Sequence, residues 1–390
     1  MTAPEQPTNP FGTGPFQALL HALRLRSGAE DAIGRRAVLA VIVAWVPLAI
    51  LAQVQGLAIG TGRASFLQDF AAYTRFLVAI PLLVLAEAPA RKWLTRVLVH
   101  FSEARLIPSS RQDEFTSLLH STRQLLGSRV ALLAIVALSY TATLTSAAAW
   151  VSYGAANWIA VDGDHGRAIS WAGWWRLLVS QPLFLSLLLT WLWRLFLWLR
   201  CLRRVARMDV RIVASHPDKA GGLGFLGQSL RAFPLFAVAF GSVIAGTLAN
   251  MLTYDNRSAT ALAPFVVATI VVILLLCAGP LLVFMRPLRQ AQDDAELTYG
   301  ALATSLGLRF EERWLDKAPD VGPDALAVPD FSATTDLYSV AGQVVEMRFI
   351  PLEIKDFVPL LIGTVLPFLP ILLQQVSFTE LVEVVRHVLM

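Results

Sequence analysis

The most distinctive candidate for chemistry in this chain is the segment HPDKAGGLGFLG at residues 216–227. Gly222, Gly224 and Gly227 have the G-x-G-x-x-G spacing of dinucleotide-binding loops. Such a loop needs a strand before it and a soluble helix after it, because the pyrophosphate lies against the first turn of that helix. Residues 210–215 have the composition of a strand, but a membrane-length apolar run follows Gly227. This context argues against a dinucleotide site.

Three other interpretations of the segment remain open. It is an ordinary glycine-rich turn between two membrane spans. Alternatively, it binds an anionic ligand or lipid headgroup, because nearby arginines and free N–H groups at a helix start attract phosphate. A catalytic loop would use His216 and Asp218 as acid and base, but no second carboxylate cluster completes such a site. The candidate ligand-binding residues are Arg203, Arg204, Arg207, His216, Asp218, Lys219, Gly221, Gly222 and Gly224.

The composition places these residues in a membrane protein. Of the 390 residues, 56% are hydrophobic and 15% are charged, whereas soluble domains carry about 25% charged residues. Apolar runs of roughly 20 residues are long enough to cross a bilayer. Seven such runs are present, at 37–56, 70–89, 130–153, 175–198, 231–253, 261–285 and 357–376. The sequence therefore predicts an all-α polytopic transmembrane helix bundle of about seven spans, with cytoplasmic helical extensions.

The seventh run gives the weakest prediction of a span. Its uninterrupted apolar part, residues 357–373, corresponds to about 25 Å of helix, against a hydrocarbon core of about 30 Å. It also contains Pro359, Pro367 and Pro370. A re-entrant segment is the alternative to a full crossing.

Lysine and arginine predict the orientation of the spans. The segments before the first span, at 91–128, at 200–231 and at 286–355 hold 24 of the 32 lysines and arginines. The other connections and the C-terminal tail hold five. Because positive residues stay on the cytoplasmic side, we expect a cytoplasmic N-terminus and, with seven crossings, an external C-terminus. The first span has no signal peptide before it and would act as an uncleaved anchor.

This topology divides the chain into four parts. Residues 1–36 form a cytoplasmic N-terminal tail. Residues 37–285 form a six-span bundle with cytoplasmic loops at 91–128 and 200–230. Residues 286–355 form a cytoplasmic helical segment. Residues 356–390 contain the seventh span and an interfacial C-terminal helix.

Polar residues inside the spans are the remaining functional candidates. Glu87 precedes Arg91 by four residues, which favours an ion pair at the helix end. Ser242, Gly246 and Asn250 recur every four residues, which favours close helix packing over a lining role. Broken helices tend to line cavities, so the proline-rich last span is the best candidate for a pathway. The candidate lining residues are Thr141, Thr145, Asn250, Gly363, Thr364 and Pro367.

No metal ion or cofactor is expected. Cys201 and Cys277 form no C-x-x-C motif, and the six histidines are scattered without ligand spacing. No nucleic-acid partner is expected either. The expected partners are membrane lipid, anionic headgroups and further copies of the chain.

Several segments resemble a set of uncharacterised bacterial multi-pass membrane proteins. They are HPDKAGGLGFLG, FEERWL, PDFSATTDLYSV and VPLLIGTVLPFLPILLQQVSFTELVEVV, all in the second half of the chain. The resemblance implies a bacterial inner-membrane location and brings no activity.

The first functional hypothesis is a channel or transporter for a small solute or ion. The alternative is a membrane-embedded sensor or scaffold that binds an anionic lipid, nucleotide or protein partner through the basic glycine segment. A membrane enzyme ranks last.

Overall fold

The computed structural model describes Phe11 and residues 31–60, 65–152, 158–163, 166–255, 258–315 and 329–375. In this part of the chain, seven helical stretches are long and apolar enough to cross a membrane. They are Ile33–Val54, Phe70–Glu103, Arg129–Ala147, Trp171–Val205, Pro234–Tyr254, Ala261–Trp314 and Ile354–Leu373. The predicted all-α bundle of about seven spans is confirmed, and the chain is a multi-pass membrane protein.

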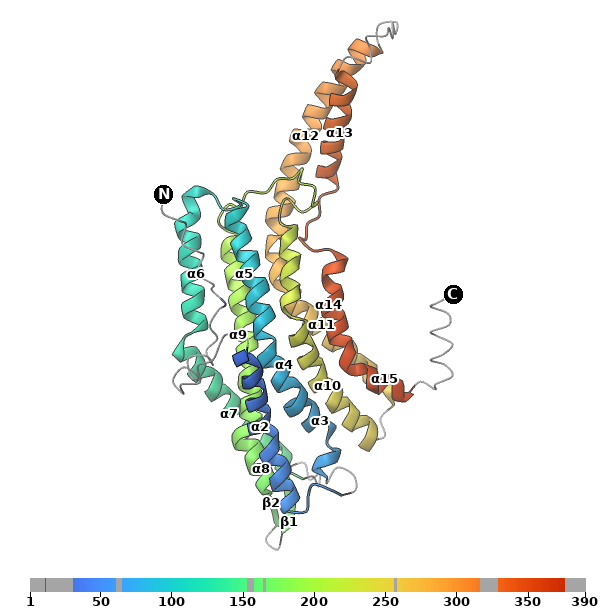
Figure 1. Cartoon of the computed structure of the whole chain (residues 1–390). Coiled ribbons are helices and arrows are strands. Elements are labelled where there is room, and N and C mark those ends of the chain that lie inside the picture. Colours follow the sequence, from blue (N-terminus) through green and yellow to red (C-terminus); the bar gives the residue numbers. More distant parts are fainter. Residues whose placement is uncertain are drawn as a thin grey trace.

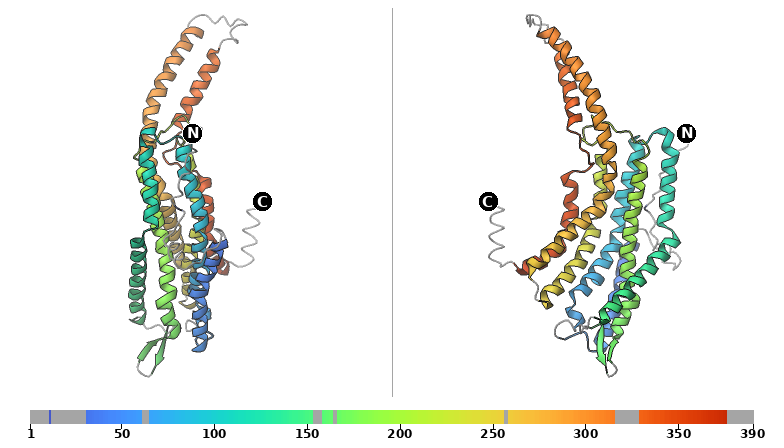
Figure 2. Two further views of the ribbon diagram at one scale, coloured as in Figure 1. Left: turned by 60° about the vertical axis from the view of Figure 1, so that its left-hand side comes forward. Right: turned by 180° about the vertical axis from the view of Figure 1, so that it is seen from behind.

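The bundle has two different ends (Figures 1 and 2). A small antiparallel β-hairpin lies at one end, and two long helices project from the other. We call these the hairpin end and the stalk end, and the two projecting helices the stalk. The helices are α2 (Asp31–Val54), α3 (Phe70–Tyr73), α4 (Ile80–Leu85), α5 (Glu87–Glu103), α6 (Gln112–Leu126), α7 (Arg129–Ser152), α8 (Trp171–Trp175), α9 (Gln181–Val205), α10 (Pro234–Tyr254), α11 (Ala259–Ala278), α12 (Met285–Trp314), α13 (Asp330–Val345), α14 (Ile354–Val365) and α15 (Leu369–Gln375). The strands are β1 (Ala160–Gly163) and β2 (Gly166–Ile169).

Helix α9 forms the centre of the bundle. Its buried side chains include Trp191, Leu195, Trp198 and Leu202, and the helix packs against α4, α6 and α7. The indole nitrogen of Trp191 donates to the Leu83 carbonyl at 2.9 Å, so this buried N–H keeps a partner. Helices α7 and α11 leave leucine and valine side chains exposed, as lipid-facing helices do.

Two spans contain π-helical stretches near the hairpin end. Thr74–Ala79 joins α3 to α4, and Arg176–Ser180 joins α8 to α9. A π-helical turn inserts one extra residue and so changes the direction of the side chains beside it. Each stretch contains one arginine, Arg75 or Arg176.

Helix α10 makes close contacts with its neighbours through glycines. A Cβ atom on Gly241 would lie 2.9 Å from the Thr364 carbonyl oxygen, and one on Gly363 would lie 2.8 Å from that of Pro234. A Cβ on Gly246 would lie 2.0 Å from the Thr74 hydroxyl. The close helix approach predicted at Gly246 is present, whereas Asn250 of the same face borders a cavity.

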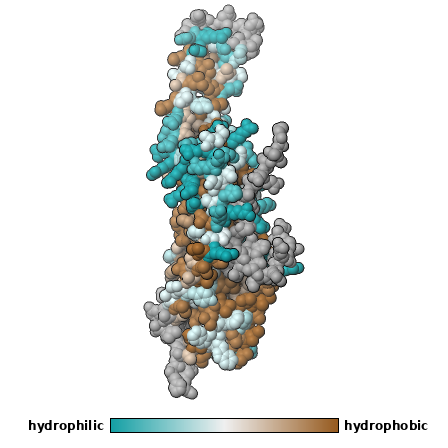
Figure 3. Space-filling model, turned by 90° about the vertical axis from the view of Figure 1, so that its left-hand side faces the viewer, coloured by the Kyte–Doolittle hydropathy of each residue, from teal (hydrophilic) through white to brown (hydrophobic). Residues whose placement is uncertain are grey.

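The stalk is an antiparallel pair of helices that extends beyond the bundle (Figure 1). Helix α12 has 30 residues and is about 45 Å long. Phe310 and Trp314 contact Phe331 with ring centroids 5.0 Å apart in each case, and Arg313 pairs with Asp330. Figure 3 shows a hydrophilic band between the stalk and a lower part whose visible surface is mainly hydrophobic.

The seventh apolar segment is helical but bent. Helix α14 ends at Val365, a 3-10 turn covers Leu366–Phe368, and α15 follows. The break coincides with Pro367 and Pro370, because proline removes a helical hydrogen bond. The predicted interfacial C-terminal helix lies outside the described residues, which end at 375.

The predicted pairing of Glu87 with Arg91 is wrong. Glu87 instead lies 3.4 Å from the guanidinium of Arg194, which is 3% exposed. The Arg194 guanidinium also lies 4.6 Å from the centre of the Trp191 ring. Glu87 is 17% exposed, so both charges of this pair lie largely inside the bundle.

Candidate functional site

The glycine loop, residues 206–223 between α9 and the following 3-10 helix, is organised around one carboxylate. Oδ1 of Asp218 accepts hydrogen bonds from the backbone N–H of Ala220 at 2.8 Å and of Gly222 at 3.1 Å. Oδ2 accepts from the N–H of Gly224 at 2.8 Å. The Nδ1 atom of His216 lies 2.8 Å from Oδ1. The N–H groups considered for an external anion thus donate to a carboxylate of the loop itself.

The backbone geometry of the loop and the ionised state of Asp218 both fit a loop folded around this carboxylate. Lys219, Gly221 and Gly222 have positive φ values of 53°, 64° and 87°, which turn the chain around the carboxylate. Burial opposes ionisation of Asp218, but the N–H donors of Ala220, Gly224 and Gly222 outweigh it and lower the pKa of the carboxyl. Residues 210–215 form no strand. The loop therefore has the features of a structured turn.

We expect Asp218→Asn to lower the stability of the protein by about 1–3 kcal/mol. The amide replaces one acceptor oxygen by an NH2 group, which faces backbone donors. Since the folded pKa is lowered, the wild-type contribution is present above about pH 4 and is lost as pH falls through that lowered pKa. The apparent melting temperature in detergent measures both effects. Asp209→Asn is the control, because Asp209 is 81% exposed and makes one ion contact, at 3.5 Å; equal losses in both variants would contradict the prediction.

The glycine loop also joins the base of the stalk to the bundle. The backbone N–H of Arg348, in the link between α13 and α14, donates to the Lys219 carbonyl at 2.6 Å. The Arg348 guanidinium donates to the Asp218 carbonyl at 2.7 Å. On the other side, the N–H of Arg211 donates to the Leu106 carbonyl beyond α5 at 2.8 Å. Three segments distant in sequence thus meet at this loop.

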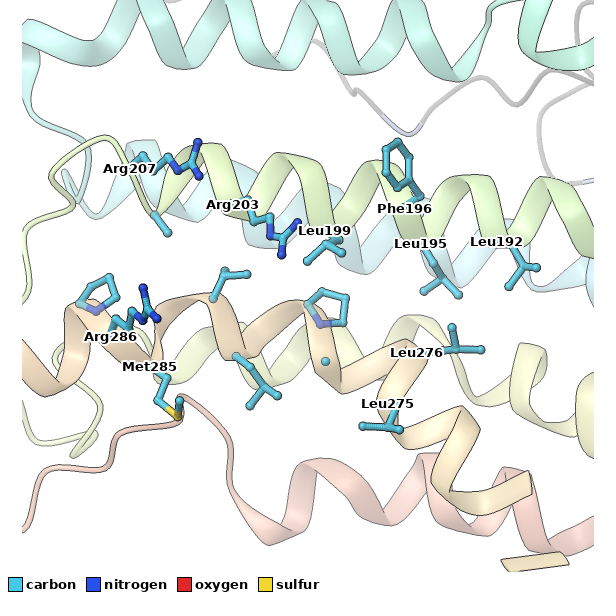
Figure 4. Close-up of a pocket in the computed structure, with 16 residues that line it drawn as sticks. Leu192, Leu195, Phe196, Leu199, Arg203, Arg207, Leu275, Leu276, Met285 and Arg286 are labelled. Atoms are coloured by element: carbon cyan, nitrogen blue, oxygen red, sulfur yellow. The ribbon is translucent and has the colours of Figure 1, made fainter. Parts of the chain in front are cut away.

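A groove at the stalk end contains two of the predicted ligand-binding residues. It lies between α9 and the stretch that runs from α11 into α12, and its volume is about 830 Å³. Figure 4 shows Arg203 directed from α9 toward the facing helix, and Arg286 on that facing helix. Arg207 follows Arg203 by four residues and also lines the groove. We call this groove between α9 and α12 the arginine groove. Its other lining residues are Leu192, Leu195, Phe196, Leu199, Ala206, Leu275, Leu276, Gly279, Pro280, Leu282, Val283, Met285 and Pro287.

The arginine groove is cationic at one end and apolar along the rest. No carboxylate lines it, and its three arginines make no ion pair with another residue in the described ranges. All three are exposed. Arg204 is exposed too, but it does not line the groove. The predicted set is therefore divided between this groove, the self-contained glycine loop and the adjacent surface.

A smaller cavity of about 280 Å³ lies at the hairpin end. Its charged groups belong to Asp69, Arg75, Arg176 and Asp255, and its side-chain amides belong to Gln68 and Asn250. Trp158 and Met251 supply much of its apolar wall. Arg75 and Arg176 each lie in a π-helical stretch, and no pattern in a single sequence signals a π-helical turn.

The six candidate lining residues do not share one cavity. Asn250 borders the hairpin-end cavity. Thr141 and Thr145 are exposed on α7, and their hydroxyls donate to carbonyls of their own helix. The candidates in the last span lie at its contact with α10: Gly363, Thr364 and Pro367.

The described ranges hold no group of three or more histidine, cysteine, aspartate or glutamate side chains placed to bind a metal ion. The arginine groove and the hairpin-end cavity are two cavities that contain predicted site residues. No family model, no curated protein and no solved structure matches the chain.

Proposed function

We propose that this protein is a membrane-embedded sensor or scaffold that binds an anionic phospholipid in the arginine groove and presents the stalk to other molecules. The observation that carries the proposal is the arrangement of Arg203, Arg207 and Arg286 at one end of an apolar groove that contains no carboxylate. A phosphate group would meet three cations there, and its acyl chains would follow the leucines.

One face of α9 has the polarity of a phospholipid along its length. Leu192, Leu195 and Leu199 recur at helical spacing on that face, and Arg203 continues the same row. Arg207 lies one turn beyond it. A small soluble anion would leave the apolar part of the groove without a contact. A neutral lipid would leave the arginines without a counter-charge. A two-part ligand with an anionic head matches both.

The groove is positioned to communicate with the stalk. Arg207 lies at the start of the glycine loop, which holds the link between α13 and α14 through Arg348. Arg286 lies in the first turn of α12. A headgroup bound between these arginines would bridge α9 to the base of the stalk and stabilise one position of the stalk relative to the bundle.

We expect the triple variant Arg203→Gln/Arg207→Gln/Arg286→Gln to lose its preference for anionic lipid. Each arginine contributes about 1 kcal/mol toward an anionic membrane surface, so affinity should fall about a hundredfold. Native mass spectrometry of the purified protein with phosphatidylglycerol and phosphatidylcholine measures the preference. Arg204→Gln is the matched control, because this arginine lies on the same turn outside the groove. Equal phosphatidylglycerol binding by the wild type and the triple variant would refute the proposal.

The proposal includes an orientation and a location. We place the stalk end and the N-terminus in the cytoplasm of a bacterial cell, with the bundle in the inner membrane. The lysine and arginine distribution supports this placement. A reporter enzyme inserted in the β-hairpin should be active only outside, and one inserted in the stalk only inside; accessibility of both from one side would exclude this topology.

A channel or transporter for a small solute is the second candidate, and one observation favours it. Asn250 and two arginines border a cavity inside the span region near the hairpin end, as expected for a solute-binding position. Flux measurements in liposomes test this candidate, and solute flux that Asn250→Ala abolishes would favour it over the scaffold.

A further inference from the structure

We infer that the outer face of α12 in the stalk docks a basic amphipathic helix of a partner protein. This face carries the leucine stripe, which consists of Leu297, Ala301, Thr304, Leu308 and Leu315. The inference rests on the proposed scaffold role and deepens it, because it names the chemistry of the molecule to which the stalk is presented. The stripe shares no residue with the arginine groove.

The leucine stripe lies on the side of α12 turned away from α13. Its members follow one another at intervals of four, three, four and seven residues, which places them on one face of a helix. Phe310 and Trp314 lie on another face and make the ring contacts with α13. Leu297, Leu308 and Leu315 are 78%, 56% and 67% exposed, so no described segment covers them.

Contact with water or lipid does not account for this surface. Single exposed apolar side chains are normal, but an apolar patch on one helix face marks an interaction surface. The outward face of α13 stands in the same surroundings and is polar, with Ser332, Thr335, Asp336 and Ser339 all exposed. Leu297, the member nearest the bundle, already lies about 18 Å along α12 from its first residue. Figure 3 shows hydrophobic surface on the stalk beyond the hydrophilic band.

Carboxylates flank the leucine stripe on both sides. Asp293 and Glu311 lie along one side of it, and Asp294 and Glu312 lie along the other, since members of each pair are five full turns apart. All four are exposed and make no ion pair with a described residue. Residues 290–347 as a whole hold eleven aspartates and glutamates against three lysines and arginines. The stalk is therefore acidic, in contrast to the basic remainder of the chain.

The sign of this charge selects the partner. Nucleic acids and anionic lipid surfaces are repelled by the carboxylates. A second copy of the chain is disfavoured too, because two copies in one membrane share an orientation. Their stalks would bring Asp293 against Asp293 and Glu311 against Glu311, and like charges that face each other weaken an interface.

The shape of the surface selects a helix. The leucine stripe is straight and extends over about 27 Å, from Leu297 to Leu315. A partner helix of about five turns matches that length, and its own apolar stripe would cover the leucines. Lysine or arginine side chains on both flanks of the partner would reach the two rows of carboxylates.

The test uses the full chain in phosphatidylcholine nanodiscs, with an environment-sensitive fluorophore attached at Thr304→Cys in the stripe. Both native cysteines, Cys201 and Cys277, are buried, so the label attaches at the new site. The probe is a synthetic amphipathic helix with leucines on one face and lysines on both flanks. We expect it to cause a saturable blue shift of the label, and none when the same label is attached at Thr335→Cys on α13.

Variants of the stripe measure the two parts of the interaction. Leu297→Gln/Leu308→Gln should weaken binding of this peptide about a hundredfold, since two apolar contacts are lost. Leu302→Gln is the matched control, because Leu302 is 53% exposed on the same helix outside the stripe. Glu311→Gln/Glu312→Gln should weaken binding about tenfold at low salt and less at high salt. Equal affinities of the wild type and the leucine variant would overturn the inference.

Peptide controls and the oligomeric state complete the test. The inference also fails if a peptide of the same composition with its leucines spread around the helix binds as tightly, or if a peptide with glutamate in place of lysine does. Native mass spectrometry that shows a dimer of the chain, dissociated by Leu297→Gln/Leu308→Gln, would assign the stripe to a second copy instead. Because these nanodiscs contain no anionic lipid, a negative result here leaves the phosphatidylglycerol preference of the arginine groove intact, and the two failures are distinguishable.

Discussion

Glu87→Leu should destabilise the protein by about 3–5 kcal/mol, the usual cost of removing one partner of a buried ion pair. The guanidinium of Arg194 is 3% exposed, and two of its nitrogens, Nε and Nη1, are already buried without a hydrogen-bond partner. Removal of Glu87 leaves this cation with the Trp191 ring as its remaining attraction. Arginine cannot lose its proton to escape the cost. Unfolding in a mixed-detergent titration measures the loss.

The double variant Glu87→Leu/Arg194→Leu distinguishes a charge effect from a packing effect. Replacement of both partners by apolar side chains is often close to neutral, so the double variant should be more stable than Glu87→Leu alone. Glu103→Leu is the control, because Glu103 is exposed at the end of the same helix, α5. A double variant less stable than Glu87→Leu would show that the pair does not account for the loss.

The spans were predictable because a single requirement produces them. Each crossing must present about 20 apolar residues to lipid, and this requirement is visible in the sequence without knowledge of any contact.

The partners of individual side chains were not predictable in the same way. Arg194 is 107 positions from Glu87, whereas Arg91 is four positions away, and sequence alone favours the near neighbour. Arg286 joins Arg203 only because the stretch from α11 into α12 packs along α9. In the glycine loop, the residue types suggested a site for an external anion, but Asp218 uses the same N–H groups. Each of these contacts depends on which helix faces pack against each other in the folded protein, and a single sequence does not reveal that packing.

The second large effect is expected from Gly363→Val at the contact between α10 and α14. A Cβ atom at this position would lie 2.8 Å from the carbonyl oxygen of Pro234, and valine adds two further methyl groups. The obstructing atom belongs to the backbone of α10, so no side-chain rotation relieves the clash and the helices must separate. Overpacking of this kind costs about 1–3 kcal/mol, and more where the backbone is involved.

Separation of α10 from α14 would also disturb a second close contact, because each helix contributes a glycine that faces the backbone of the other. Gly241 of α10 faces the Thr364 carbonyl oxygen, so the shift that relieves one glycine loosens the other. Gly34→Val in α2 is the matched control, since no atom lies within 4 Å of a Cβ built there. Detergent unfolding should show a large loss for Gly363→Val and a small one for Gly34→Val. Similar losses would mean that helix propensity rather than close approach sets the cost, and that the bent last segment is not held against the bundle by its glycines.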